Sequence, residues 1–163
     1  MDQKFKDFIK VTKFLNKKDI IPVLYGSLGL YQIIEPQNEI DDIDFLIPEI
    51  WLKDKCVEFM EYLESNNFKM DNEHEHEFSH PKIKGRIAFG SMEESEMHSG
   101  LKSDGLIPAS FDGAKYLTLS AQQYLNAYRA CFKDSYRRKK KGDSDMKKIK
   151  ALEEYIKNYS NQS

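Results

Sequence analysis

The chain has 163 residues, of which 40% are hydrophobic and 32% are charged. This length and balance predict one globular domain with a real core and argue against a disordered chain. The formal net charge is -2 at pH 7, so no global electrostatic argument favours a protein that binds nucleic acid.

Cellular location follows from cysteine usage and from apolar runs. No apolar run approaches the length of a membrane span, and the first residues lack the layout of a signal peptide. The cysteines, Cys56 and Cys131, fall on apolar faces of predicted helices, which favours buried thiols in a reducing compartment. We therefore expect a cytoplasmic protein that does not contact a membrane.

The N-terminal segment predicts an amphipathic helix from Asp2 to Asn16, with lysines on its solvated side. The segment 21–48 follows and predicts a strand, a tight turn, a short helix, a loop and a second strand. The first strand covers Val23 to Tyr25, because these residues are β-prone and apolar. The second strand covers 42–47, where apolar and acidic residues alternate.

Asp42 and Asp44 carry the chemistry of this segment. Side chains two residues apart on a strand share a face, so the two carboxylates lie side by side while Ile43 and Phe45 point into the core. Neighbouring carboxylates repel unless a cation lies between them, and Mg²⁺ prefers one or two carboxylates together with substrate phosphates. The alternative is a charged turn at the mouth of a strand.

Gly26 and Ser27 end the first strand. Glycine permits a turn whose backbone can approach a ligand closely. Ser27 would lie at the start of a helix, where free N–H groups attract phosphate. Taken alone, the pair also suits an ordinary strand-to-helix turn.

The middle of the chain predicts a helix from Glu49 to about Asn66 and a strand that begins near 68–70. Strict alternation across 73–80 would place His74 and His76 on one strand face. With His80 they could bind zinc, or the histidines could be incidental. The next strand is predicted at 82–91, and the polar segment 92–105 predicts an irregular loop that either covers a site or is a mobile surface loop.

The C-terminal third begins with a hairpin signal, Asp112-Gly113, within 106–119. A capping box from Ser120 to Gln123 opens a helix that leads into five consecutive cations at 137–141. These cations are either a solvated helix end or the groups that neutralise a triphosphate or a polyanionic partner. The segment 143–145 predicts the cap of a final helix.

The combination of Tyr25-Gly26-Ser27 with Asp42-Ile43-Asp44-Phe45 resembles the polymerase beta-like nucleotidyltransferase superfamily. The later order of elements is similar to small antibiotic nucleotidyltransferases, such as the lincosamide and aminoglycoside enzymes. The resemblance implies an α+β fold, with a mixed sheet flanked by helices and a C-terminal helical part at 120–160 of one domain, 1–163.

The same resemblance implies a function. Asp42 and Asp44 would hold Mg²⁺ or Mn²⁺, and Gly26 and Ser27 would bind the triphosphate of a nucleoside triphosphate. A nucleoside monophosphate would then be transferred to a hydroxyl of a small-molecule acceptor.

One position departs from the family pattern. The antibiotic-type relatives place a third carboxylate two residues after an arginine, and this sequence has Ala88 there, after Arg86. Glu75, Glu77 or Glu93 could substitute, and we favour Glu77 as a third metal ligand. If none does, the alternative is a catalytically degraded protein that binds a nucleotide or a partner on the same fold.

Overall fold

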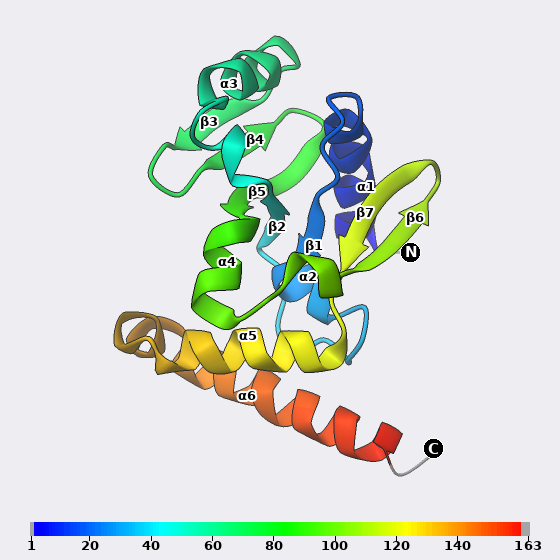
Figure 1. Cartoon of the computed structure of the whole chain (residues 1–163), viewed down its shortest axis with the longest axis vertical. Coiled ribbons are helices and arrows are strands. Elements are labelled where there is room, and N and C mark those ends of the chain that lie inside the picture. Colours follow the sequence, from blue (N-terminus) through cyan, green and yellow to red (C-terminus); the bar gives the residue numbers. More distant parts are fainter. Residues whose placement is uncertain (1, 161–163) are drawn as a thin grey trace.

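The computed structural model describes residues 2–160 and is organised around one seven-stranded mixed sheet (Figure 1). The strands are β1 (Val23–Tyr25), β2 (Asp42–Ile47), β3 (Lys69–Asn72), β4 (Glu77–His80), β5 (Ile83–Ser91), β6 (Ile107–Phe111) and β7 (Ala114–Thr118). The helices are α1 (Gln3–Asn16), α2 (Gly26–Leu30), α3 (Cys56–Ser65), α4 (Met92–Ser99), α5 (Ala121–Lys133) and α6 (Ser135–Ser160). Two 3₁₀ turns, η1 (Glu49–Trp51) and η2 (Ser103–Gly105), complete the chain, and the class is α+β as predicted.

The strand order is β3-β4-β5-β2-β1-β7-β6. Strand β2 lies in the centre, antiparallel to β1 and parallel to β5. Strand β7 runs parallel to β1, whereas β6, β4 and β3 join by antiparallel pairing. The central position of β2 buries its apolar side chains and fixes its register on both sides.

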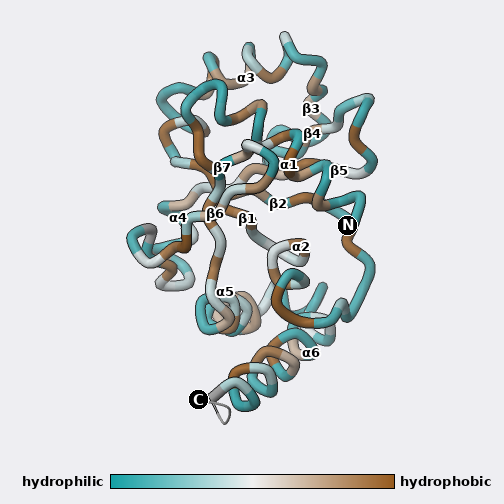
Figure 2. The backbone as a smooth tube through the Cα atoms, turned by 90° about the vertical axis from the view of Figure 1, so that its right-hand side faces the viewer, coloured by the Kyte–Doolittle hydropathy of each residue, from teal (hydrophilic) through white to brown (hydrophobic). Residues whose placement is uncertain are grey.

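The two faces of the sheet are covered by different helices. Ile43, Phe45 and Ile47 of β2 pack into a core that also holds buried residues of α1 and α3. On the opposite face, Val23 and Leu46 pack with buried residues of α5 and α6. Figure 2 shows α3 above the sheet and α5 and α6 below it. The acidic residues of β2 therefore face the C-terminal helices.

Several elements differ from those predicted. The helix expected from Glu49 to Asn66 is interrupted, because η1 and a turn precede α3. The segment 92–105 is mostly helical rather than an irregular loop, since it holds α4 and η2. Ser91 caps α4 by accepting a hydrogen bond from the Glu94 N–H, and Gly100 ends it with a φ of 69°.

The alternation expected across 73–80 is also wrong. Residues 73–76 form a turn, and only 77–80 belong to a strand, β4. His76 has a φ of 50°, a left-handed conformation that breaks the pleat. His74, His76 and Phe78 therefore do not follow one strand face.

The C-terminal helices confirm one prediction and correct another. Helix α6 is continuous through 143–145, so these residues do not cap a helix. Its start is instead marked by Asp134, whose Oδ1 accepts hydrogen bonds from the N–H groups of Tyr136 and Arg137. The capping box of α5 is confirmed, with reciprocal hydrogen bonds between Ser120 and Gln123.

Replacing Ser120 with alanine is expected to lower the free energy of unfolding by about 1 kcal/mol, because the start of α5 loses its cap. Ser110→Ala, on the exposed edge strand β6, is the matched control and should change the stability little. Urea unfolding of both variants measures the difference. Equal effects would show that the cap contributes nothing.

The hairpin at 106–119 is confirmed, with positive φ angles at Asp112 and Gly113 between β6 and β7. Cys56 and Cys131 are free thiols, and both are half-buried rather than fully buried. Within residues 2–160, no helix has the length and apolar character that crossing a membrane requires.

Candidate active site

Strand β2 brings Asp42 and Asp44 to the face that carries α2, α5 and α6. Asp44 pairs in register with Tyr25, the last residue of β1. The turn that follows Tyr25 is therefore placed directly beside the Asp44 carboxylate. The sequence-predicted residues Gly26, Ser27, Asp42 and Asp44 all line one cavity.

Gly26 is needed for this close approach. Its φ is 64°, and a Cβ built at this position would overlap a carboxylate oxygen of Asp44 and lie 2.9 Å from its Cγ. A side chain at position 26 would therefore be strained and would displace the carboxylate. A second glycine, Gly29 of α2, makes room in the same way for the hydroxyl of Tyr124, which donates a hydrogen bond to the Leu24 carbonyl at 2.9 Å.

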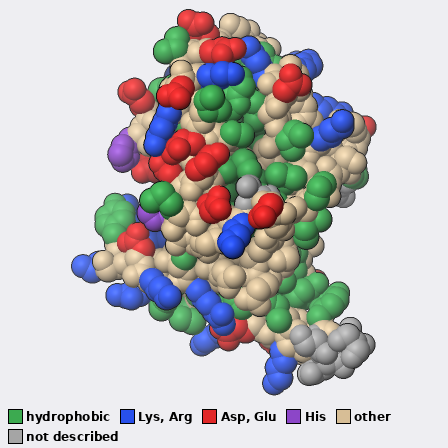
Figure 3. Space-filling model, viewed as in Figure 1, with side chains coloured by type: hydrophobic (Ala, Val, Ile, Leu, Met, Phe, Trp, Pro, Cys, Tyr) green, Lys and Arg blue, Asp and Glu red, His purple; other side chains and the backbone are tan. Residues whose placement is uncertain are grey.

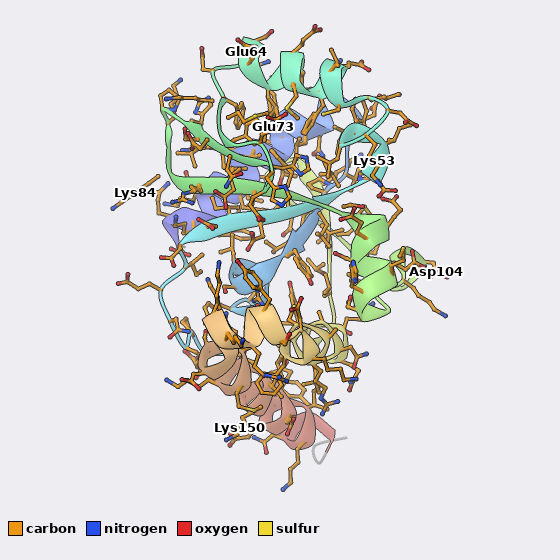
Figure 4. All side chains as sticks on the ribbon, turned by 90° about the vertical axis from the view of Figure 1, so that its left-hand side faces the viewer. Lys53, Glu64, Glu73, Lys84, Asp104 and Lys150 are labelled. Atoms are coloured by element: carbon orange, nitrogen blue, oxygen red, sulfur yellow. The ribbon has the colours of Figure 1, made fainter. Side chains whose placement is uncertain are left out.

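The cavity has a volume of about 1570 Å³ and opens between the sheet, α4, α5 and α6. Figure 4 shows this arrangement, with the first turns of α6 (orange) below β2 and α4 (green) to one side. The α5 wall is formed by Tyr124, Tyr128 and Cys131, and the α4 wall carries Glu94, Ser95, His98 and Ser99.

The basic run at 137–141 lines the cavity on the α6 side. Figure 3 shows Lys and Arg side chains gathered over the region where α5 and α6 meet, below a group of acidic side chains. The structure thus brings the cationic run to the same cavity as Asp42 and Asp44.

Sequence reasoning missed Lys148, which lies farther along α6. Its side chain is buried, and its Nζ donates a hydrogen bond to the Ser27 Oγ at 3.0 Å. Lys148 shares a helical face with Asp145, Ile149 and Leu152, all of them buried. A lysine at a position that apolar periodicity assigns to the core was the available signal.

The electrostatics of the site favour a bound cation beside the acidic pair. Burial, followed by the charge of Asp42, raises the pKa of Asp44 from 3.8 to about 6. Burial also raises the pKa of Asp42, and the charge of Glu77 adds to this shift. Desolvation lowers the pKa of Lys148. Each shift disfavours the charged form of its group in the ligand-free protein.

No protein-family model matches the sequence. The chain is 37% identical to the uncharacterized protein YnaI of Bacillus subtilis (strain 168) over 155 residues, which cover 94% of this chain and 98% of YnaI. The chain belongs to the same family as YnaI.

Two solved structures show the fold of this YnaI relative. An antigenic nucleotidyltransferase-like protein from Paracoccidioides brasiliensis matches with a TM-score of 0.62 and 13% identity, over 93% of this chain and 75% of that one. The lincomycin-bound lincosamide antibiotic adenylyltransferase LnuA matches with a TM-score of 0.55 and 16% identity, over 90% of this chain and 96% of LnuA. The predicted nucleotidyltransferase-like fold is therefore confirmed.

The candidates for a third carboxylate lie in different places in this YnaI relative. Ala88 pairs in register with Asp44 on one side and with Glu77 on the other. Glu77 therefore lies one strand beyond position 88, where the resemblance to antibiotic nucleotidyltransferases predicts the third carboxylate. Its carboxylate accepts a hydrogen bond from Arg86 at 3.0 Å. Glu75 and Glu77 both line the cavity.

Glu93 is committed elsewhere. Its Oε2 accepts a hydrogen bond from the Glu49 N–H at 2.6 Å. Glu49 follows the C-terminal end of β2, whereas Asp42 lies at the N-terminal end of that strand. Between residues 2 and 160, no three acidic, histidine or cysteine side chains converge into a group that could hold a metal.

The histidines do not form a zinc site of the kind the alternation suggested. His74 is exposed on the turn before β4. His80 is engaged by backbone groups, since its Nδ1 accepts from the Lys82 N–H at 3.1 Å and its Nε2 lies 3.0 Å from the Asn66 carbonyl oxygen.

The acidic pair nevertheless fits a divalent cation in the presence of a ligand. Asp42 and Asp44 supply two hard oxygen ligands on one face, and burial together with neighbouring acidic groups raises the pKa of both carboxyls. Mg²⁺ needs only one or two carboxylates when substrate phosphates and water complete its coordination.

Proposed function

We propose that this protein is a nucleotidyltransferase that moves a nucleoside monophosphate from a nucleoside triphosphate to a hydroxyl of a small molecule. The observation that carries the proposal is one cavity in which the acidic pair, Asp42 and Asp44, faces the basic start of α6, with the Asp44 carboxylate packed against Gly26. This combination suits a polyphosphate held beside a divalent cation. Because nucleoside triphosphates are intracellular substrates, we propose a cytoplasmic location.

Each group has a role in this proposal. Asp42 and Asp44 would hold Mg²⁺ or Mn²⁺, with Glu77 as a proposed further ligand. The metal would neutralise charge on phosphate oxygens. The Ser27 hydroxyl and the backbone at Gly26 would bind the triphosphate of the nucleotide. The cations at 138–141 would stabilise the negative charge of the leaving pyrophosphate.

The chemistry is an in-line displacement. The acceptor oxygen forms a bond to the α-phosphorus as the bond to the bridging oxygen breaks, pyrophosphate leaves, and the hydroxyl proton passes to a carboxylate or water. Ligand pockets usually measure about 300–1,000 Å³. The cavity of about 1570 Å³ therefore has room for a nucleotide and a small acceptor together.

The test is pyrophosphate release from each nucleoside triphosphate with Mg²⁺ and a panel of hydroxylated small molecules. Asp42→Asn is expected to weaken Mg²⁺-dependent ATP binding by at least about tenfold, because it removes one of two charged ligands. Asp104→Asn is the control, since this exposed residue lies away from the cavity (Figure 4). Magnesium-dependent binding that survives Asp42→Asn would contradict the proposal.

One observation favours a second candidate, a protein that binds the nucleotide without turnover. Ala88 occupies the strand position between Asp44 and Glu77, so no carboxylate stands next to Asp44 on β5. Magnesium-dependent ATP binding that is lost in Asp42→Asn, combined with no pyrophosphate release for any acceptor, would identify this binding protein.

A further inference from the structure

Among residues 2–160, Lys148 is a buried cation that forms no salt bridge with an acidic side chain. Its exposed fraction is 6%, and its Nζ lies 3.0 Å from the Ser27 hydroxyl oxygen and 5.2 Å from the centre of the Tyr128 ring. A hydroxyl and an aromatic ring are weak partners for a desolvated ammonium group.

The nearest acidic group on its own helix is already committed. Asp145 is fully buried, and both of its oxygens accept hydrogen bonds from Arg137, at 2.9 Å from Nε and 3.2 Å from Nη2. This bidentate pair satisfies the Asp145 carboxylate. In the part of the chain that the structure describes, Lys148 forms no salt bridge of its own.

The unpaired charge of Lys148 lies where an anionic ligand could reach it. The same cavity is lined by Lys148, Ser27, Arg137 and Lys141. The Lys148 ammonium group contacts the hydroxyl of Ser27, which follows Gly26 in the turn beside Asp44. Burying an unpaired ammonium is costly, and an anion that enters the cavity would offset this cost. Phosphate oxygens suit this position, since one could accept from both Lys148 and Ser27.

We infer that Lys148 binds the β- or γ-phosphate of the nucleotide and makes the site select triphosphates over monophosphates. The inference rests on the proposed function and adds to it a specific residue and a specific part of the ligand. Because Asp42 and Asp44 hold the metal side of the polyphosphate, Lys148 acts on the opposite side, from α6. Removing its charge should affect ligands in proportion to the phosphates that reach it.

The experiment compares the affinities of ATP, ADP and AMP, each with Mg²⁺, by titration calorimetry. Lys148→Met keeps an unbranched side chain one atom shorter than lysine and removes its charge. We expect ATP binding to weaken about 10- to 100-fold, as for loss of a charged hydrogen bond, while AMP binding changes less than about twofold. Lys150→Met is the matched control, because Lys150 is exposed on the side of α6 away from the sheet (Figure 4).

The outcomes separate this inference from the proposed function. If Lys148→Met keeps the wild-type ratio of ATP to AMP affinity while Asp42→Asn loses ATP binding, the inference is overturned and the proposed function stands. An equal loss for ATP and AMP would show a structural role and would also overturn it. A wild-type protein that binds no nucleotide overturns both. Lys148→Gln repeats the comparison should the methionine variant fail to fold.

Discussion

Replacing Asp44 with asparagine is expected to lower the proposed nucleotidyl transfer about 10²–10³-fold while making the folded protein more stable at neutral pH. The two effects have the same origin. Burial and the neighbouring Asp42 raise the pKa of Asp44 to about 6, so at pH 7 the folded protein holds a carboxylate in a place that disfavours its charge. Asparagine removes that charge and one of the two carboxylates that we propose as ligands of the cation.

The expected loss of activity is about 10²–10³-fold, by comparison with removal of other preorganised electrostatic groups in enzymes. The expected gain in the free energy of unfolding at pH 7 is up to about 2 kcal/mol, after allowance for partial contact of Asp44 with solvent in the cavity. Such opposite effects are characteristic of a residue kept for function rather than for stability.

The direction of the Asp44 pKa shift determines how the stability difference between the wild type and Asp44→Asn depends on pH. The pKa of Asp44 is higher in the folded protein than its usual value of 3.8, so the folded protein binds this proton more tightly than the unfolded chain does. The destabilisation is therefore complete above pH 6 and fades as the pH falls toward 4. Urea unfolding of the wild type and Asp44→Asn should show a difference that shrinks over this range.

A control separates this effect from general titration of acidic residues. Glu64→Gln removes an exposed carboxylate on α3, remote from the cavity (Figure 4). The difference in the free energy of unfolding between Glu64→Gln and the wild type should therefore stay the same across this pH range. An Asp44→Asn variant that is less stable than the wild type at pH 7 would contradict the unfavourable environment described for this carboxylate.

The sequence was sufficient to predict where the acidic half of the proposed site lies. Alternation of acidic and apolar residues on β2 places Asp42 and Asp44 on the face opposite Ile43 and Phe45. This feature is local, because successive side chains on a strand alternate between its two faces.

The basic half of the proposed site could not be predicted from the sequence, because tertiary packing brings its residues together. Lys148 and Ser27 are 121 residues apart in the chain, and only the packing of α5 and α6 under the sheet brings them together. Periodicity gives the inward face of α6 but does not show which cavity that face meets. Asp145 was misread as part of a cap because the sequence does not show that it pairs with Arg137.

Helix α4 was missed although its signals were present. Its sequence has no apolar stripe, and none of its side chains is fully buried, so hydrophobic periodicity indicated a loop. Ser91 followed by Glu94 matches the spacing of a capping box, and Gly100 is a typical helix end. Capping chemistry was here the better guide than periodicity.

Gly26→Ala is expected to destroy the site although it adds a single methyl group. The methyl carbon would occupy the space of the Asp44 carboxylate, and the φ of 64° would add a strain of about 1–2 kcal/mol. The carboxylate, the turn or both must move, and a displacement of about 1 Å at such a site can cost about 10²-fold in activity. We therefore expect Mg²⁺-dependent ATP binding and transfer both to fall by at least this factor.

Gly113→Ala supplies the comparison that isolates the contact with Asp44. Gly113 has a φ of 83° in the β6–β7 turn, and a Cβ there would meet no atom within 4 Å. Both alanine variants therefore carry the strain of a left-handed conformation, but only Gly26→Ala displaces a carboxylate. Thermal unfolding should show a loss of stability from strain in both variants, with a larger loss for Gly26→Ala because its methyl group also overlaps Asp44, whereas ATP titration should show a loss for Gly26→Ala alone. Equal ATP affinity in the two variants would mean that the close packing of Gly26 on Asp44 does not position the acidic pair.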